Sequence, residues 1–148
     1  MSKSADVKMR FATQDDITWL LDQERNIVDK NWVKRCLDHR EYIVAHEKES
    51  ENQYLGYIRF SYFWGKYPYL DMISIVQNQQ GRGIGNSLYL FWEDQMRRAG
   101  FKTLVTSSFQ NLTDVQNWHW RNGFREAGKL TLGKNEPNPE IFFVKELE

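Results

Sequence analysis

The chain has little of several residue types: one cysteine and three prolines in 148 residues, and no net charge. The single cysteine, Cys36, excludes an internal disulfide and a cysteine-based metal site, and it fits a reducing compartment. Twenty basic and twenty acidic residues balance, so no global field recruits nucleic acid or an acidic membrane surface. No apolar run approaches the roughly 18–20 residues that cross a bilayer, and the first residues lack the apolar core of a signal peptide. We therefore expect a cytoplasmic protein that uses no metal, nucleic acid or membrane.

The composition is that of a folded protein. Hydrophobic residues make up 41% of the chain and aromatic residues 15%, which argues against disorder. A chain of 148 residues is long enough for one sizeable core. We expect a single domain that spans residues 1–148.

Apolar spacing predicts the element order β-α-α-β-β-β-α-β-α-β-β. Thr13 is expected to cap the first helix, and Gly100 to end the third. The polar stretch 47–53 is expected to be a turn, and residues 64–68 a loop. The order indicates a mixed α+β sheet with a single strand–helix–strand crossover, whereas a dinucleotide fold needs repeated crossovers. The strands are expected near 7–11, 42–46, 54–63, 69–76, 101–107, after 123–128 and at 141–144, and the helices after residue 13 and near 32–37, 83–99 and 111–121.

The most informative segment is glycine-rich and runs from Gln80 to Ser87. It lies between an apolar strand pattern and a helical pattern, and it contains Gly81, Gly83 and Gly85. Glycines let the backbone approach a ligand closely, and the N–H groups and positive dipole end of a helix favour an anion. The segment predicts a phosphate-binding site, although three glycines can also serve only to make a tight turn.

Two common phosphate motifs do not fit this segment. No Gly-Lys-Ser/Thr follows the turn, as the nucleotide-triphosphate loop would require. A dinucleotide fingerprint would also place a further glycine or alanine at 86–88, where the chain has Asn86, Ser87 and Leu88.

In this element order the segment resembles motif A of the GNAT superfamily of acyl-CoA-dependent N-acyltransferases, Gln/Arg-x-x-Gly-x-Gly/Ala. Here it reads Gln80-x-x-Gly83-x-Gly85. An apolar strand precedes the turn, and a helix and a strand follow it at the family's lengths. A second match lies downstream, where Asn111 follows a strand and the next helix ends in residues 121–124, Arg-Asn-Gly-Phe. The specific part of the resemblance covers residues 71–124.

The resemblance implies a splayed, mixed central sheet of about six to seven strands with about four helices, and acetyl-CoA as co-substrate. Ile75 and Val76 would offer backbone groups to the pantetheine arm, and an N–H near Ile75 would stabilise the oxyanion. Asn111 would hydrogen-bond the same arm, or it would serve only as a cap or turn residue. Arg82 would add a charge-assisted contact to the pyrophosphate. The residues implied for the pyrophosphate are Gln80, Gly81, Arg82, Gly83, Ile84, Gly85, Asn86 and Ser87.

Acyl transfer to an amine needs a neutral amine, a stabilised oxyanion and a proton for the leaving thiolate. The family often has Tyr at the position of His119, and an imidazolium would be a good acid there. Asp71, on the strand before the turn, is the candidate base; the position of the best-known family glutamate is Tyr69. The alternatives are a packing role for His119 and a surface or strand-end role for Asp71. Glu24 and Glu41 are weaker candidates for the base.

Aromatic residues concentrate near one expected hairpin end, and Trp19 and Trp32 lie in helices that usually form the acceptor wall. They could box a cationic amine, but an ordinary aromatic core with an exposed loop is slightly favoured. Cys36, at helical spacing with Trp32 and Val33, is expected in the core. The hairpin aromatics are Tyr57, Tyr62, Phe63, Trp64, Tyr67 and Tyr69.

These features favour an N-acetyltransferase that transfers the acetyl group directly to a primary amine of a small molecule or peptide. One alternative is a non-catalytic acyl-CoA-binding or sensing domain, and another is a protein-interaction module with the aromatic loop as its patch. The acceptor, the acyl-chain preference and the oligomeric state stay open, with a homodimer among the alternatives.

Overall fold

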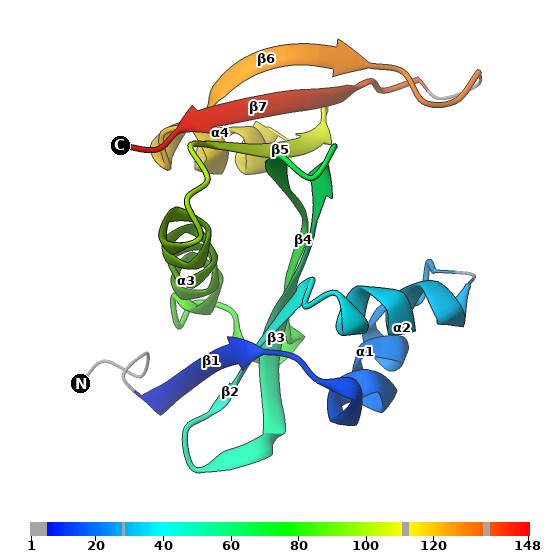
Figure 1. Cartoon of the computed structure of the whole chain (residues 1–148), viewed down its shortest axis with the longest axis vertical. Helices are drawn as coiled ribbons and strands as arrows, with labels where there is room; N and C mark the ends of the chain where they lie inside the picture. Colours follow the sequence, from blue (N-terminus) through cyan, green and yellow to red (C-terminus); the bar gives the residue numbers. More distant parts are fainter. Residues whose placement is uncertain (1–5, 28, 111–112, 135–136) are drawn as a thin grey trace. The chain divides into compact units, whose positions relative to one another are not determined.

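A computed structural model describes residues 6–27, 29–110, 113–134 and 137–148 (Figure 1). The described chain contains seven strands and four α-helices, in the order that the sequence predicts. They are β1 (Val7–Phe11), α1 (Ile17–Gln23), α2 (Lys30–Asp38), β2 (Tyr42–Glu47), β3 (Ser50–Phe63), β4 (Tyr67–Ile75), α3 (Ile84–Arg98), β5 (Thr103–Phe109), α4 (Thr113–Arg121), β6 (Arg125–Leu130) and β7 (Glu140–Glu146).

The strands form one mixed sheet in the order β1-β2-β3-β4-β5-β7-β6. The pair β4–β5 is parallel, and the pairs β1–β2, β2–β3, β5–β7 and β6–β7 are antiparallel. The predicted α+β class, with six to seven strands and four helices, is therefore confirmed. By contact density the chain forms two compact units, residues 1–60 with 72–92 and residues 61–71 with 93–148.

The first unit contains β1, β2, most of β3, and the helices α1 and α2, which lie side by side (Figure 1). A capping box starts its helical segment: the Asp15 N–H donates to Thr13 Oγ1, and the Thr13 N–H donates to Asp16 Oδ2 at 2.8 Å. The predicted cap at Thr13 is confirmed. One core cluster joins the helices to the strands, and it contains Ala12, Leu20, Val33, Cys36, Leu37, Tyr42, Val44 and Tyr57.

The second unit is built on β5, β7 and β6, with β7 between the other two strands. In β4, Tyr69 pairs with Val105 and Leu70 with Thr106, and β4 continues beyond these residues to Ile75. The largest buried side chain of β7 is Phe143, which is fully shielded from solvent.

Two glycines end the helices on which the site depends. Gly100 has φ +93° and Gly123 has φ +89°, in the left-handed region that favours glycine. After α3 the Phe101 N–H donates to Met96 O, and after α4 the Phe124 N–H donates to His119 O. Both are Schellman motifs. The predicted stop at Gly100 is confirmed, and the Gly-Phe pair at 123–124 is a helix terminator that also buries Phe124.

Two predicted loops are shorter than expected. β3 begins at Ser50, which pairs with Glu47, so only two residues of the polar stretch 47–53 form the turn. Strand pairing therefore overrides the polar composition of residues 50–53. β4 begins at Tyr67, and the turn before it has positive φ at Trp64 (56°) and Gly65 (67°), as a two-residue type I′ hairpin requires.

Among the described helices, none is both long enough and apolar enough to cross a lipid bilayer.

Candidate functional site

The glycine turn adopts backbone conformations that side chains other than glycine rarely take. Gly81 has φ +91° and Gly83 has φ +76°, and a Cβ at either position would meet no described atom within 4 Å. The glycines are therefore needed for the backbone path rather than for space. α3 begins at Ile84, and the Ser87 N–H makes the first helical bond, to Gly83 O at 3.0 Å. The N–H groups of residues 83–86 have no acceptor within the helix, so they form an anion-binding end.

A fourth glycine, Gly56 in β3, matters for a different reason. A Cβ on Gly56 would lie 2.6 Å from Ser74 O and 2.9 Å from Ile75 Cδ1, which is closer than packing allows. Gly56 thus lets β3 approach the end of β4 that leads into the turn. The sequence carried one signal for it, a glycine inside a strand pattern, which the sequence interpretation did not use.

Arg82, in the middle of the turn, contacts Gln79 and Glu47. Its Nη1 donates to Gln79 Oε1 at 2.8 Å and lies 3.1 Å from Glu47 Oε1. The Arg82 side chain is 16% exposed and the Glu47 side chain 33%, so this pair is only partly shielded. The contact with Glu47 has the distance of an ion pair, but it lacks the geometry of a hydrogen bond. Glu47 Oε1 is shielded from water and has no hydrogen-bond donor among the described residues.

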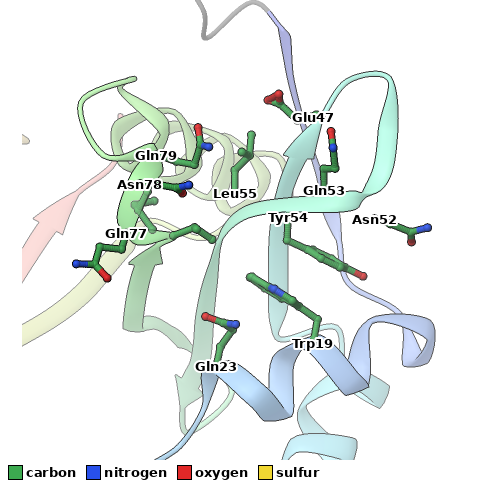
Figure 2. Close-up of a pocket in the computed structure, with 12 residues that line it drawn as sticks. Trp19, Gln23, Glu47, Asn52, Gln53, Tyr54, Leu55, Gln77, Asn78 and Gln79 are labelled. Atoms are coloured by element: carbon green, nitrogen blue, oxygen red, sulfur yellow. The ribbon is translucent and has the colours of Figure 1, made fainter.

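A pocket of about 680 Å³ lies beside the turn (Figure 2). It is formed by α1, the end of β2, the start of β3, the end of β4 and the segment 77–79. Its lining is dominated by uncharged amides, and its only ionisable carboxylate is that of Glu47. The lining residues are Trp19, Gln23, Glu47, Asn52, Gln53, Tyr54, Leu55, Ile75, Val76, Gln77, Asn78 and Gln79.

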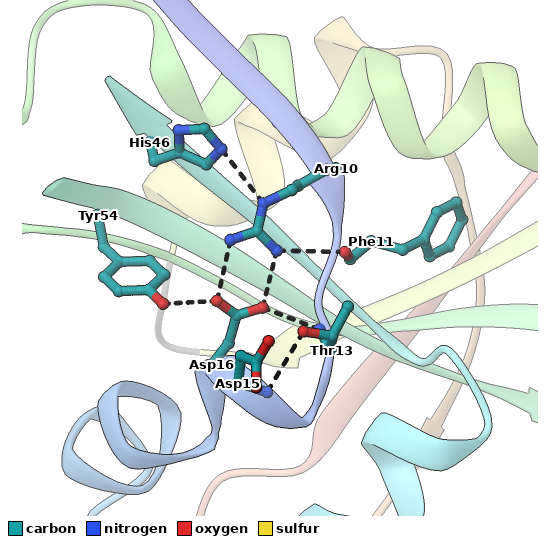
Figure 3. A network of polar contacts seen from close by, with 7 residues as sticks. All are labelled: Arg10, Phe11, Thr13, Asp15, Asp16, His46 and Tyr54. Atoms are coloured by element: carbon teal, nitrogen blue, oxygen red, sulfur yellow. Dashed lines mark hydrogen bonds and ion pairs between the residues drawn. The ribbon is translucent and has the colours of Figure 1, made fainter. Parts of the chain in front are cut away.

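The aromatic wall of this pocket is fixed in place. Trp19 stacks on Tyr54 with ring centroids 4.3 Å apart and an interplanar angle of 11°. The Tyr54 hydroxyl donates to Asp16 Oδ1, and Arg10 binds both oxygens of Asp16 at 2.8 and 2.9 Å (Figure 3). Because Arg10 also donates to His46 Nε2, the proton of that imidazole lies on Nδ1, which donates to Glu47 O. The wall is therefore preorganised.

The pKa of Asp16 reflects this network. The carboxylate is 2% exposed, and burial alone would raise its pKa. The hydrogen bonds from Arg10, Tyr54 and the Thr13 N–H outweigh burial and lower the pKa from 3.8 to about 2. Asp16 is thus a charged structural anchor for the pocket wall.

Several of the aromatic residues belong to the core. Glu24 is 6% exposed and accepts hydrogen bonds from Tyr42, Tyr57 and Arg59, and burial followed by the bond to Glu24 raises the pKa of both tyrosines. The Trp32 ring lies under the Arg59 guanidinium at 5.2 Å. These contacts favour a packing role for this group, whereas Trp19 lines the pocket. Cys36, 5% exposed, is in the core as predicted.

His119 lies on α4 in the second unit, and its side chain is 3% exposed. It packs against Phe124 and Phe143, with ring centroids 5.8 and 4.8 Å away. Burial lowers its pKa from 6.5 to about 4, against a small opposing effect of the Ser107 backbone. The ring is therefore neutral at pH 7. Neither ring nitrogen has a partner with hydrogen-bond geometry among the described residues.

A family model described as "Acetyltransferase (GNAT) family" matches residues 8–124. The chain belongs to the acetyltransferase (GNAT) family. The resemblance seen in the glycine turn is thereby confirmed. No curated protein sequence matches the chain.

Solved structures show the GNAT fold at low sequence identity. A GNAT-family acetyltransferase from Bacillus cereus ATCC 10987 has a TM-score of 0.73 at 20% identity, covering 95% of this chain and 96% of its own. Ard1 from Thermoplasma volcanium has a TM-score of 0.81 at 9% identity, covering 97% and 99%. A protein from Salmonella typhimurium, solved with its cofactor acetyl-CoA, has a TM-score of 0.77 at 18% identity, covering 97% and 95%.

The GNAT motif residues and the expected catalytic residues fall in different units. Residues 75–87 are in the first unit, whereas Asp71 and His119 are in the second. Asp71 is half-buried on β4 and, two residues from Tyr69, shares a face of the strand with it. Asn111 lies outside the described residues. Val76 uses its N–H for Leu55 O and its carbonyl for the Gln79 N–H, both at 2.9 Å.

In the second unit, sequence reasoning missed a chain of polar contacts that starts at Tyr69. Tyr69 contacts Ser107 Oγ, and Ser107 donates to Glu140 Oε2 at 2.6 Å. Tyr69 also stacks on Phe63 at 4.8 Å. Serine on an alternating strand carries no signal of its own, since its partner lies 33 residues away.

Within the described ranges, no group of three or more histidine, cysteine, aspartate or glutamate side chains is arranged to hold a metal ion.

Proposed function

We propose that this GNAT-family chain transfers an acetyl group from acetyl-CoA to a primary amine of a small molecule or peptide, by direct attack in a ternary complex. The observation that carries the proposal is the glycine turn, where two residues with positive φ lead into the N-terminus of α3. This geometry suits a pyrophosphate, because backbone N–H groups converge and no Cβ is present to obstruct them. The structural neighbour solved with acetyl-CoA supports the same co-substrate.

The pyrophosphate would lie on Gly81, Gly83 and the first turn of α3, over residues 80–87. Arg82 would contribute a charge-assisted contact. The backbone of Ile75 would meet the pantetheine arm. The Val76 N–H and one lone pair of its carbonyl are already used in hydrogen bonds, so Val76 would offer the arm only the second lone pair of that carbonyl.

For the chemistry we propose Asp71 as the base that takes the proton from the ammonium group. We propose His119 as the donor to the leaving sulfur. Neither buried ring nitrogen has a partner with full hydrogen-bond geometry among the described residues, although the Ser107 backbone raises the pKa of the ring as a hydrogen bond would. A ligand sulfur would be a partner for one of these nitrogens. Because the ring is neutral at pH 7, its N–H would donate a hydrogen bond to the leaving sulfur rather than transfer a proton as an imidazolium. The proton that the thiolate takes up would come from the attacking nitrogen, which must lose it as the amide forms.

The proposal includes a cytoplasmic location and action as one domain over residues 1–148. The amide-lined pocket of the first unit would bind the acceptor. The composition of that pocket favours a polar acceptor over an aliphatic one, because six of its lining side chains are Gln or Asn.

The experiment has two steps. Thermal unfolding is first measured with CoA and with acetyl-CoA, and both should raise the Tm. Release of free thiol from acetyl-CoA is then followed across a panel of primary amines. Binding without thiol release would favour an acyl-CoA sensor. If neither CoA species raises the Tm, the acetyltransferase proposal is wrong and an interaction module becomes the better explanation.

A further inference from the structure

The contact between Arg82 and Glu47 joins the glycine turn to the amide-lined pocket. Arg82 belongs to the turn, while Glu47 and Gln79, which both contact its guanidinium, line the pocket. Arg82, Glu47 and Gln79 all belong to the first unit. The same guanidinium is therefore attached to the pocket and lies in the phosphate-binding segment.

The contact is poorly satisfied on the side of Glu47. Its Oε1 lies 3.1 Å from the guanidinium, yet it accepts no hydrogen bond from any described residue and is shielded from water. A buried carboxylate oxygen without a donor is costly. Arg82 holds the charge of Glu47 in place without meeting its need for a donor, so a better donor would be favoured at this position.

The surroundings of Glu47 indicate what that donor would be. The pocket has about 680 Å³ of space, and Glu47 is its only charged lining residue, among six amides and two aromatic rings. Amide side chains both donate and accept hydrogen bonds, so they bind charged and uncharged polar groups alike and give no preference for a charged ligand. Only Glu47 selects for charge, and it selects a cation with N–H donors.

We propose that Arg82 couples the binding of CoA to the binding of a cationic acceptor, by exchanging Glu47 for the pyrophosphate. We call this exchange the latch, and the inference rests on the proposed function. In the ligand-free chain Glu47 holds Arg82. When CoA binds, the guanidinium turns to the pyrophosphate, a dianion with better geometry for it, and Glu47 is left to bind an ammonium group of the acceptor in the pocket. CoA and a cationic acceptor then bind cooperatively, with CoA favoured first. By linkage, each ligand raises the affinity for the other by the same factor.

The first test is a double-mutant cycle on CoA affinity, measured by calorimetry. Glu47→Gln should tighten CoA binding roughly threefold to fivefold, because it removes the Glu47 carboxylate, which competes with the pyrophosphate for Arg82. In an Arg82→Gln background the same change should have no effect. Glu49→Gln is the matched control, since it removes the same charge from an exposed position in the same hairpin. Thermal unfolding of each variant checks the fold.

If Glu47→Gln changed CoA affinity equally with and without Arg82, the latch would be overturned. The effect would then come only from long-range repulsion between the Glu47 carboxylate and the phosphates of CoA. The same conclusion would follow if Glu47→Gln and Glu49→Gln changed CoA affinity alike. Failure of the wild-type chain to bind CoA would instead overturn the proposed function, so the two failures are distinguishable.

The second test uses 1,4-diaminobutane as the cationic probe and 1,4-butanediol as its neutral counterpart, with unacetylated CoA so that no reaction occurs. The diamine should bind the CoA-bound protein several-fold more tightly than the free protein, and the diol should show no such difference. Glu47→Gln should abolish this difference, and Glu49→Gln should retain it. If the wild-type chain binds diamine equally with and without CoA, or not at all, the assignment of Glu47 to an ammonium group is wrong.

Discussion

The hydroxyl of Tyr69 on β4 lies 2.5 Å from Ser107 Oγ on β5. Ser107 uses its proton to donate to Glu140 on β7, so the Tyr69 hydroxyl is the donor to Ser107. The chain Tyr69–Ser107–Glu140 thus joins three strands of the second unit. Tyr69 stands at the position that the sequence comparison assigns to the best-known family glutamate.

This chain of contacts should stabilise the fold measurably. Glu140→Ala removes the final acceptor and leaves two half-buried hydroxyls to rearrange, so we expect a loss of about 1 kcal/mol in the free energy of unfolding. Tyr69→Phe should cost a similar amount, and the double variant should cost less than the sum, because both changes break one network. Urea denaturation measures all three. Glu148→Ala, an exposed carboxylate near the same end of the chain, should have no effect, and additive losses would contradict the network.

The sequence was sufficient for the elements and for the glycine turn, because each has a local cause. Thr13, Gly83 and Gly100 act within a few residues of themselves, through a cap, a positive φ and a helix stop. The family motif likewise lies within one short segment. Such features can be identified without knowing which residues far apart in the sequence contact one another in the fold.

What the sequence could not provide was the pairing of distant residues. Glu47 and Arg82 are 35 positions apart, and Gly56 meets Ser74 only because β3 and β4 pair. The expectation of an imidazolium at His119 considered only the residue type. Its burial, which lowers the pKa to about 4, includes packing against Phe143 of β7, a strand that comes later in the chain.

Acid should destabilise the protein through Asp16. Its pKa is about 2 in the folded chain and 3.8 without the fold, so the folded state binds the proton less readily. Its contribution of ~2 kcal/mol is complete above about pH 4 and is lost as the pH falls toward 2. Asp16→Asn should lower stability at pH 7 and flatten this part of the pH profile. Asp15→Asn, at the exposed neighbouring position, is the control, and an unchanged profile for Asp16→Asn would contradict the assignment.

His119 should also make the folded protein less stable as the pH falls, but over a different pH range from Asp16. Its pKa is about 4 in the folded chain against 6.5 ordinarily, so the unfolded state takes up the proton first as the pH falls. Stability should decline between about pH 6.5 and pH 4, by up to ~3 kcal/mol from this group. NMR of the imidazole nitrogens should find a neutral ring at pH 7, with the exposed His39 as an internal reference. A His119 ring that is protonated at pH 7 would contradict the burial argument.

The proposed role of His119 at the leaving sulfur gives a kinetic prediction. His119→Ala should lower kcat by about 10²-fold or more while changing CoA affinity little, because the side chain is expected to act on the sulfur and not on the pyrophosphate. Steady-state kinetics and calorimetry measure the two effects separately. His119→Asn retains a side-chain N–H and should recover part of the rate. Turnover at the wild-type level in His119→Ala would remove this residue from the chemistry.

The glycine turn itself can be tested with two substitutions of equal size. Gly83→Ala places a Cβ on a residue with φ +76°, which costs about 1–2 kcal/mol or forces the turn to change its path. Gly85→Ala lies inside α3, where its Cβ would make ordinary contact with Ile75 at 3.7 Å and where alanine favours the helix by up to ~1 kcal/mol. Gly83→Ala should therefore lower both the Tm and CoA affinity, whereas Gly85→Ala should keep or raise the Tm. If Gly83→Ala kept full CoA affinity, the positive φ at this position would not be what forms the phosphate site, and the N-terminus of α3 alone would have to account for binding.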